Sequence, residues 1–382
     1  MRKHNILLIW NEFSNMGGIE RIIFNFLSNF DRKKYNVTLC CLFNGWGLHN
    51  SLLKEVEKFV PVVEIGADLN KAIDFNALFK LVKLLKNLHI DIVRTYSIYA
   101  NRYGPLAAWI AGIRNVVCSY HSIYNFSVSK KTYLLDSFIL LNCKILLVSS
   151  DSMKRHCLSR FMFNADKIQI VNDSVDTEKI PSYSQEDLLK IRNSIGIPHE
   201  DIILISIGRL ERMKRFDLLV EAFIAINKKY PNVSLIVLGD GSQKDNLHSL
   251  AKVKNLSGRI KFLGYQKDIW QFLALADIFV LTSDYEGSPL VVLEAMAMGL
   301  PIVTTDVGNC KDIVVNRAGK CGTVCPVGNV DAISEAILSL IGNQEQRQSM
   351  GNIARNKVRQ EYSLSREKTF YDHLFDSLLT KF

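Results

Sequence analysis

Residues 283–309 read SDYEGSPLVVLEAMAMGLPIVTTDVGN, a polar turn followed by two apolar runs with a glycine between them. Ser288 has the side chain of an N-cap, and Pro289 suits the first position of a helix. Gly299 stands where a left-handed C-terminal cap is favoured. The pattern therefore predicts a turn, a helix with a well-marked start, and a strand.

The start of that helix suits a ligand that carries both phosphate and sugar. Its unpaired backbone N–H groups can bind an anion without any charged side chain. Glu286 before the helix and Glu294 inside it can accept hydrogen bonds from hydroxyl groups. A nucleotide sugar fits this combination. A structural helix with a solvated glutamate fits it as well, so other parts of the chain must decide.

Short β-type runs alternate with helical patterns along most of the 382 residues. A chain of this length exceeds the usual span of one hydrophobic core. The alternation predicts an α/β fold in which two Rossmann-like domains with parallel sheets face each other across a cleft. We expect an N-terminal domain at 1–178 and a C-terminal domain at 179–360. A helix at 361–382 is expected to cross back to the first domain.

The net charge of +9 is concentrated in one half of the chain. Residues 1–180 hold 23 Lys and Arg against 15 Asp and Glu, whereas the remainder is nearly balanced. A basic surface attracts nucleic acid, anionic membranes or acidic substrates. Because the chain has no RNA-type aromatic motif or zinc finger, we expect an anionic membrane surface as partner and no nucleic acid.

The segment 71–90 combines an apolar stripe with lysines. The stripe consists of Phe75, Leu78, Phe79, Val82 and Leu85, beside Lys80, Lys83 and Lys86. Two interpretations stay open: an amphipathic helix that inserts into a membrane, or a core-facing helix with a basic outer side. The second is favoured for the helix itself, and electrostatic docking remains possible with either.

We expect a cytoplasmic protein without an export signal. The apolar run that follows His4 stops at Asn11, too short for the core of a signal peptide. No apolar run approaches the roughly 18 residues that a spanning helix needs. The eight cysteines are then expected to be reduced. Cys321 and Cys325 lack a second Cys or His pair nearby, so neither a disulfide nor a metal is expected.

Motifs along nearly the whole chain share one resemblance. They read NEFSNMGGIERIIFNF, VSSDSMKRHC, IVNDSVDTEKI, GRLERMKRFDLL, VLGDGSQKDNL and EGSPLVVLEAMAMGLPIV. The last has two glutamates with seven residues between them in a turn-helix setting. With these motifs the chain resembles the retaining GT-B glycosyltransferases of family 4, also called glycosyl transferases group 1. That group includes many lipopolysaccharide and capsule transferases.

The resemblance implies a role for each matching side chain. Arg209 and Lys214 would hold the donor diphosphate, as cations that stabilise the charge of the leaving nucleotide. Glu286 would bind hydroxyls of the transferred sugar, and Glu294 those of the ribose. His121 would lie beside the donor sugar and phosphate and donate a hydrogen bond, although a lone histidine at a strand end is more often structural.

Backbone groups would complete the implied donor site. They belong to Gly287, Ser288, Leu290 and Val291, with Gly17 and Gly18 as the N-terminal glycine pair. Glycine lets the backbone approach a phosphate closely, although a simple turn explains the pair equally well. Two positions depart from the family pattern, since Arg215 and Asp173 stand where many relatives have glycine.

The resemblance implies transfer with retention and without a metal or other cofactor. No D-x-D pair occurs in the chain, so the carboxylates that hold a metal in GT-A transferases have no counterpart. The expected reaction moves a hexose or N-acetylhexosamine from a UDP sugar to a lipid-linked oligosaccharide for O-antigen or capsule. It would take place at the inner face of the cytoplasmic membrane, with the enzyme peripherally associated.

Three other functions compete with this one. A nucleotide-sugar 2-epimerase shares the fold, and a non-catalytic binding protein could use the same scaffold. A nicotinamide oxidoreductase would need a dinucleotide fingerprint after a strand. The nearest sequence is Gly239-Asp240-Gly241, which lacks the third glycine.

Overall fold

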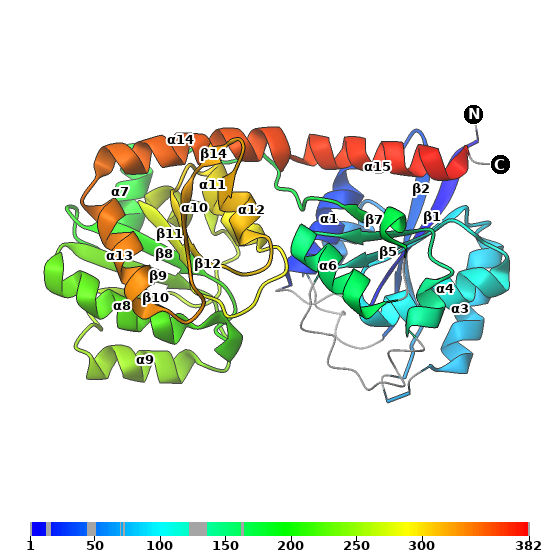
Figure 1. The fold of residues 1–382 in the computed structure, drawn as a ribbon, viewed down its shortest axis with the longest axis horizontal. Helices are drawn as coiled ribbons and strands as arrows, with labels where there is room; N and C mark the ends of the chain where they lie inside the picture. Colours follow the sequence, from blue (N-terminus) through cyan, green and yellow to red (C-terminus); the bar gives the residue numbers. More distant parts are fainter. Residues whose placement is uncertain are drawn as a thin grey trace. The chain divides into compact units, whose positions relative to one another are not determined.

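The computed structural model describes residues 2–12, 17–43, 51–68, 70–71, 73–121, 136–161 and 164–380. The chain divides into two compact units. The first unit is Met1–Ser174 with Leu364–Phe382, and the second is Val175–Ser363. Each unit is built on a parallel sheet with helices packed around it (Figure 1).

The sheet of the first unit has the order β3-β2-β1-β4-β5-β6-β7, with every neighbouring pair parallel. Its strands are β1 (His4–Trp10), β2 (Tyr35–Cys41), β3 (Val62–Glu64), β4 (Ile92–Thr95), β5 (Val116–Tyr120), β6 (Ile145–Val148) and β7 (Ile168–Ile170). Residues 6–10 of β1 are all buried, because a parallel sheet covered on two faces needs continuous apolar runs. The strand order reverses between β1 and β4.

Side-chain caps fix the starts of the helices that cover this sheet. Asp74 accepts the N–H groups of Asn76 and Ala77 before α3, and Ser97 accepts that of Ala100 before α4. The helices are α1 (Gly18–Asn29), α2 (Ser51–Glu57), α3 (Phe75–Asn87), α4 (Ile98–Ala111), α6 (Asp151–Arg160), the 3-10 turn η2 (Ala165–Lys167) and α15 (Leu364–Leu379), with a further helical segment at 136–140.

The second unit repeats the parallel design with the strand order β10-β9-β8-β11-β12-β15. Its strands are β8 (Ile202–Ile207), β9 (Val233–Leu238), β10 (Ile260–Phe262), β11 (Ile278–Leu281), β12 (Ile302–Thr305) and β15 (Gly322–Cys325), and an antiparallel pair is formed by β13 (Val315–Asn316) and β14 (Gly319–Lys320). Here the order reverses between β8 and β11. Ligands of open α/β sheets bind at the carboxyl ends of the strands at such a switch point.

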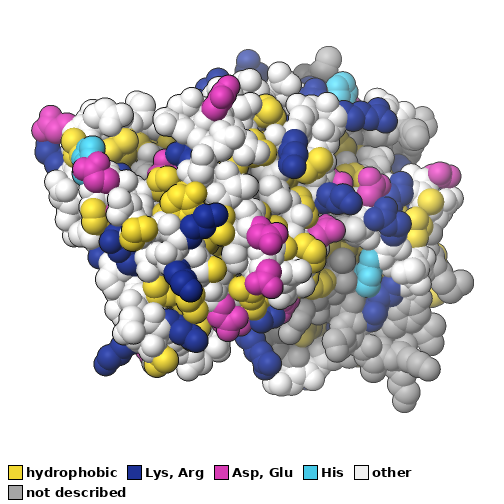
Figure 2. All heavy atoms as spheres, turned by 60° about the vertical axis from the view of Figure 1, so that its left-hand side comes forward, with side chains coloured by type: hydrophobic (Ala, Val, Ile, Leu, Met, Phe, Trp, Pro, Cys, Tyr) yellow, Lys and Arg dark blue, Asp and Glu magenta, His cyan; other side chains and the backbone are white. Residues whose placement is uncertain are grey.

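Helices surround this second sheet as well, and basic and acidic side chains are interspersed on the face that Figure 2 turns forward. The helices are α7 (Gln185–Ser194), the 3-10 turn η3 (Arg212–Lys214), α8 (Phe216–Lys229), α9 (Lys244–Val253), α10 (Trp270–Leu275), α11 (Leu290–Ala297), α12 (Cys310–Val314), α13 (Val330–Ile341) and α14 (Gln344–Glu361).

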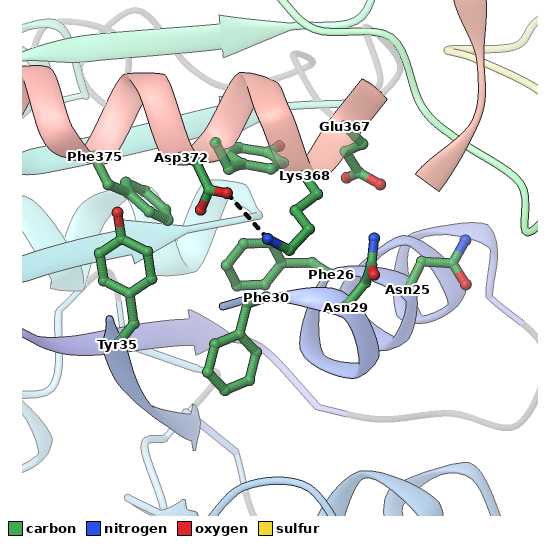
Figure 3. Close-up of a pocket in the computed structure, with 10 residues that line it drawn as sticks. Asn25, Phe26, Asn29, Phe30, Tyr35, Glu367, Lys368, Asp372 and Phe375 are labelled. Carbon is green, nitrogen blue, oxygen red and sulfur yellow. Dashed lines mark hydrogen bonds and ion pairs between the residues drawn. The ribbon is translucent and has the colours of Figure 1, made fainter. Parts of the chain in front are cut away.

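The C-terminal helix α15 packs on α1 and β2 of the first unit through aromatic side chains (Figure 3). Phe26 of α1 meets Tyr371 edge to face, with 5.1 Å between ring centroids. Tyr35 of β2 meets Phe375 in the same way at 5.5 Å. The Tyr35 hydroxyl also donates a hydrogen bond to Asp376 at 3.0 Å. These contacts pack α15 against a unit whose strands all lie between residues 4 and 170.

The structure corrects one predicted cap and confirms the other. α11 begins at Leu290 with Pro289 as its N-cap and without a side-chain cap hydrogen bond, so the prediction of a Ser288 cap is wrong. The hydroxyl of Ser288 instead accepts a hydrogen bond from Asn309 Nδ2 at 2.9 Å. Gly299 follows the last turn with φ of +81°, as a left-handed C-terminal cap requires.

The predicted apolar stripe of segment 71–90 is only half correct. Leu78, Val82 and Leu85 are buried against the core. Phe75 and Phe79 are instead 67% and 65% exposed.

All eight cysteines are free and buried. Among the described residues, no helix combines the length and apolar character needed to cross a membrane.

Candidate functional site

Two loops of the second unit meet at the carboxyl ends of β8 and β11. These loops are 208–215 and 282–289. The hydroxyl of Thr282 donates to the carbonyl oxygens of Lys214 and Arg215, at 3.2 and 2.9 Å. Because both acceptors are main-chain atoms, these hydrogen bonds fix the backbone of the first loop against the second loop. The side chains at the loop ends are therefore held in defined positions.

An ion pair joins the two loops at the start of α11. Lys214 Nζ lies 2.5 Å from Oε1 of Glu286. The hydroxyl of Ser283 donates to the same oxygen at 2.6 Å. The two charged side chains are 19% and 9% exposed, so water screens their interaction only partly. An ammonium group has three N–H donors, of which this contact uses one. A cation and a carboxylate thus lie side by side next to the helix N-terminus.

Arg215 follows directly and takes a conformation in which glycine is favoured. Its φ and ψ are 50° and 41°, in the left-handed region. The guanidinium group forms ion pairs with Asp217 and Asp284, each at 3.1 Å. Asp284 belongs to the same loop as Glu286, so Arg215 is a second link between the loops. In this left-handed conformation a glycine would carry less steric cost than an arginine.

The Glu-Gly-Ser turn before α11 is held by the loop that follows β12. The N–H of Asn309 donates to the carbonyl oxygen of Gly287 at 3.2 Å. A Cβ on Gly308 would lie 2.3 Å from that same oxygen, and Gly308 also has φ of +55°. Only glycine allows this approach. Sequence reasoning gave no role to Gly308 and Asn309, although both stand at the end of the stretch 283–309.

Glu294 lies inside α11 and is buried, with 3% of its surface exposed. This burial excludes the interpretation of Glu294 as part of a solvated helix face. Leu290 and Val291 form the first turn of the helix, where backbone N–H groups have no acceptor within the helix. Leu290 is buried and Val291 is half-buried. The N-terminal turn therefore offers main-chain donors between the two glutamates.

Arg209 follows β8 and has an exposed side chain. The backbone around it packs tightly on the loop after β9. A Cβ on Gly239 would lie 1.9 Å from the carbonyl oxygen of Gly208, and its φ is +133°. The N–H of Leu210 donates to the carbonyl oxygen of Asp240 at 2.9 Å. The Gly-Asp-Gly sequence therefore serves a close backbone approach between two loops.

In the first unit, His121 lies directly after β5 with 6% of its side chain exposed. Its Nδ1 is 3.7 Å from Asp173 Oδ1, beyond hydrogen-bond distance, and its ring stacks on Tyr96 with 5.5 Å between centroids. Burial, and secondarily the charge of Arg94, lowers the pKa of His121 to about 3. The imidazole is therefore neutral at physiological pH, with one nitrogen able to donate a hydrogen bond.

The glycine pair stands at the start of α1. Gly17 is the N-cap, and Gly18 is the first helical residue. A Cβ on Gly17 would lie 1.5 Å from a carboxylate oxygen of Glu20, so this glycine makes room for a buried acid. A Cβ on Gly18 would meet none of the described atoms within 4 Å. Residues 13–16 of this motif lie outside the described residues.

The predicted site residues thus fall into two groups. The second unit holds Arg209, Lys214, Glu286, Gly287, Ser288, Leu290, Val291 and Glu294, and the first unit holds Gly17, Gly18 and His121. Lys214 and Glu286 touch directly. Within the described chain, no cluster of three or more His, Cys, Asp or Glu side chains is arranged to hold a metal ion.

Comparison with known families divides the chain in the same manner. The model of the family described as Glycosyltransferase Family 4 matches residues 16–179. The model described as Glycosyl transferases group 1 matches residues 188–357. Together the two models account for most of the sequence.

Curated relatives and solved structures agree with these matches. Over 353 residues the chain is 27% identical to a UDP-Gal:alpha-D-GlcNAc-diphosphoundecaprenol alpha-1,3-galactosyltransferase of Escherichia coli, covering 90% of this chain and 89% of the relative. It is 34% identical over 156 residues to the lipopolysaccharide core biosynthesis glycosyltransferase LpsE of Rhizobium meliloti, covering 41% and 44%. Anabaena Alr3699/HepE, crystallised with UDP-glucose, matches with a TM-score of 0.82 and 20% identity over 98% of this chain and 99% of that one. The predicted GT-B fold is confirmed.

Proposed function

Because this chain belongs to the GT-B glycosyltransferases of group 1 and family 4, we propose that it moves a sugar from UDP to a lipid-linked acceptor with retention of configuration. The transferred group is a hexose or N-acetylhexosamine, and the product is a precursor of a surface polysaccharide. Both the Escherichia coli relative and the Anabaena structure are named with UDP-linked sugars. The name of the Escherichia coli relative also specifies a diphosphoundecaprenol acceptor.

The contact between Lys214 and Glu286 carries the proposal. The two side chains lie 2.5 Å apart at a helix N-terminus, which supports the proposal of a cation for the diphosphate beside a carboxylate for the sugar hydroxyls. In a nucleotide sugar the phosphate is bonded directly to the anomeric carbon of the sugar. One ligand can therefore contact Lys214 through its phosphate and Glu286 through its sugar hydroxyls. The N–H groups of the first turn of α11 supply further donors to the phosphate oxygens.

The proposed chemistry needs charge stabilisation rather than a protein nucleophile. The acceptor hydroxyl attacks the anomeric carbon on the face that the diphosphate leaves, and the bond between that carbon and the phosphate oxygen breaks. The hydroxyl proton passes to an oxygen of the departing phosphate. Arg209, Lys214 and the α11 N-terminus stabilise the growing negative charge without a metal ion. Glu294 binds the ribose hydroxyls.

His121 takes the role of a neutral hydrogen-bond donor in this proposal. Its lowered pKa keeps the imidazole uncharged at physiological pH. A neutral donor can orient a sugar hydroxyl or phosphate oxygen without binding the diphosphate so tightly that product release is slowed. In this proposal the lipid-linked acceptor binds at the inner face of the cytoplasmic membrane, where the enzyme is peripherally associated.

A panel of UDP-, GDP- and ADP-sugars tests the proposal. Each donor is incubated with the full chain, and hydrolysis and thermal stabilisation are measured. We expect UDP-sugars to give the largest shift and slow release of UDP, with both effects lost in the Lys214→Ala variant. Formation of a sugar epimer without acceptor would instead indicate a 2-epimerase. Binding of a donor without turnover, even with lipid acceptors present, would indicate a non-catalytic protein.

A further inference from the structure

Three helical segments of the first unit contribute side chains to the same hydrophobic core. They are α3, α4 and the segment 136–140, and Figure 1 shows α3 and α4 next to each other. The backbone N–H of Asp74, the cap of α3, donates to the hydroxyl of Tyr103 on α4 at 2.6 Å. Arg102 of α4 forms a buried ion pair with Asp136 at 2.5 Å. These two contacts join the three segments into one layer.

Large apolar side chains on this layer point to solvent. We call them the aromatic face: Phe75 and Phe79 of α3, Trp109 and Ile110 of α4, and Phe138 and Leu141 at the third segment. Four of the six are Phe or Trp, and these four are each between 65% and 68% exposed. Single exposed apolar residues are normal, but grouped ones mark an interaction surface.

Basic side chains accompany the aromatic face along α3 and at the end of α4. α3 contains Lys80, Lys83 and Lys86 and no Asp or Glu between its first and last residue. All three lysines are exposed, and Arg114 is exposed just after α4. Both acids closest to the face in sequence, Asp74 and Asp136, are buried in the contacts between segments. The charge carried by α3 and by the end of α4 is therefore positive.

We propose that the aromatic face docks this protein onto an anionic lipid bilayer. Phe and Trp side chains insert at the boundary between headgroups and acyl chains, and lysines beside them pair with anionic headgroups. A protein partner would need a complementary acidic surface, whereas an anionic bilayer supplies apolar interior and negative charge together. This inference rests on the proposed function, since a lipid-linked acceptor is reached from the membrane surface.

The position of the aromatic residues explains how docking coexists with a folded helix. Leu78, Leu81 and Leu85 of α3 are buried in the core, so the helix is anchored to the protein. Phe75 and Phe79 lie one turn apart on its outer side. Docking therefore needs no unfolding of α3, and only side chains already in contact with water change their surroundings.

The test compares binding to vesicles by sedimentation. The full-length protein is mixed with vesicles of phosphatidylcholine alone and of equal parts phosphatidylcholine and phosphatidylglycerol. We expect binding to the anionic vesicles, weakened about tenfold or more in a Phe75→Ser, Phe79→Ser, Trp109→Ser variant. Replacing Lys83 and Lys86 by Gln should weaken binding to the anionic vesicles about fivefold for each charge removed. Lys80 is left in place because it also donates to the carbonyl oxygen of Ile65.

The matched control replaces two exposed apolar residues of the second unit. Val253 and Tyr265 are 75% and 51% exposed, and their change to Ser should leave vesicle binding unaltered. Equal binding of wild type, aromatic variant and control to anionic vesicles would overturn the inference. So would vesicle-independent self-association that the aromatic variant abolishes, since the face would then contact a second copy.

Donor hydrolysis in the absence of vesicles separates this inference from the proposed function. The aromatic variant should hydrolyse the donor at the wild-type rate, because none of its substitutions changes a residue of the proposed donor site. Normal hydrolysis with unchanged vesicle binding would refute the docking surface alone. A wild-type protein that binds anionic vesicles through the aromatic face but never turns over a donor would refute the transferase proposal and leave the surface intact.

Discussion

In the second unit the carboxylate of Glu286 is held by the ammonium group of Lys214, whereas in the first unit Glu367 is buried beside the hydroxyl of Ser174. Burial raises the pKa of Glu367 to about 7, although the Ser174 hydrogen bond and the charge of Arg94 act in the opposite direction. The neutral His121 belongs to the first unit as well. Two units of similar architecture thus treat their polar groups differently.

This difference suggests a division of labour between the units. The second unit pairs opposite charges at a helix N-terminus, which suits an anionic diphosphate. The first unit lowers the pKa of His121 and raises that of Glu367 next to the sheet, and it presents an aromatic, basic exterior. We infer that charge stabilisation belongs to the second unit, while orientation of neutral hydroxyls and membrane docking belong to the first. A substitution in one unit should therefore change one side of this comparison and leave the other intact.

The largest effect is expected from Lys214→Ala. Loss of this cation removes charge stabilisation of the leaving diphosphate and should lower kcat by about 10² to 10³. The measurement is steady-state turnover of the best donor in the panel. Lys244→Ala is the matched control, because Lys244 forms an exposed ion pair with Asp240 in the same unit. If Lys214→Ala lowers kcat by less than about tenfold, the result would contradict the assigned role.

Glu367→Gln tests the neutral carboxyl group of the first unit. In the native state this group keeps a proton up to about pH 7, whereas in the unfolded chain it loses the proton near pH 4.3. The free energy of unfolding should therefore fall as pH rises through this window, by up to about 3 kcal/mol. The variant should lack that fall when wild type and variant are unfolded in urea across the same pH range.

The exposed acid Glu345 supplies a control for this pH dependence. Glu345→Gln should keep the wild-type decline of stability with rising pH. Parallel pH profiles for wild type and Glu367→Gln would show that Glu367 is ionised like an ordinary surface acid. The contrast between the two units would then be lost.

The two glutamates of the second unit should separate in their donor dependence. Glu294→Ala removes an acceptor for the ribose and should raise the Kd of every ribose-containing donor by about tenfold to a hundredfold. Glu286→Ala should have an effect that varies with the transferred sugar. Calorimetric titration with UDP and with several UDP-sugars measures both. Identical losses from the two substitutions with every donor would refute the separate roles.

The smallest effect concerns the left-handed backbone at Arg215. Arg215→Gly loses the ion pairs with Asp217 and Asp284 but relieves the left-handed strain, whereas Arg215→Ala loses the pairs and keeps the strain. The glycine variant should therefore be more stable than the alanine variant by about 1 kcal/mol. Urea unfolding of both variants measures this difference. An alanine variant as stable as the glycine variant would mean that the backbone relaxes at this position.

Local sequence signals predicted the second unit well. The turn, helix and glycine of residues 283–309 lie close together in the chain, and the φ of +81° at Gly299 follows from the cap pattern. Ser288 is not the cap because the N-cap position is taken by Pro289, and the Ser288 hydroxyl instead accepts a hydrogen bond from Asn309 in the loop after β12. That contact depends on the path of the chain between two strands and leaves no local trace.

The first unit contains features that no local pattern could predict. Arg94 in the apolar strand β4 is fully buried, and its guanidinium donates to the hydroxyl of Tyr371, 277 residues later in the chain. Periodicity also grouped Phe75 and Phe79 with the buried leucines of α3, since residues at the edge of an apolar stripe can face either core or solvent. Neighbouring helices decide between these outcomes, and they are distant in sequence.

Calorimetric titration of UDP and of uridine into wild type and Lys214→Ala tests the central claim most directly. Wild type should bind UDP much more tightly than uridine, because the proposed site in the second unit would hold the diphosphate. In the variant that advantage should shrink by about tenfold or more, while uridine binding stays unchanged. An undiminished preference for UDP in the variant would contradict the claim that Lys214 holds the diphosphate.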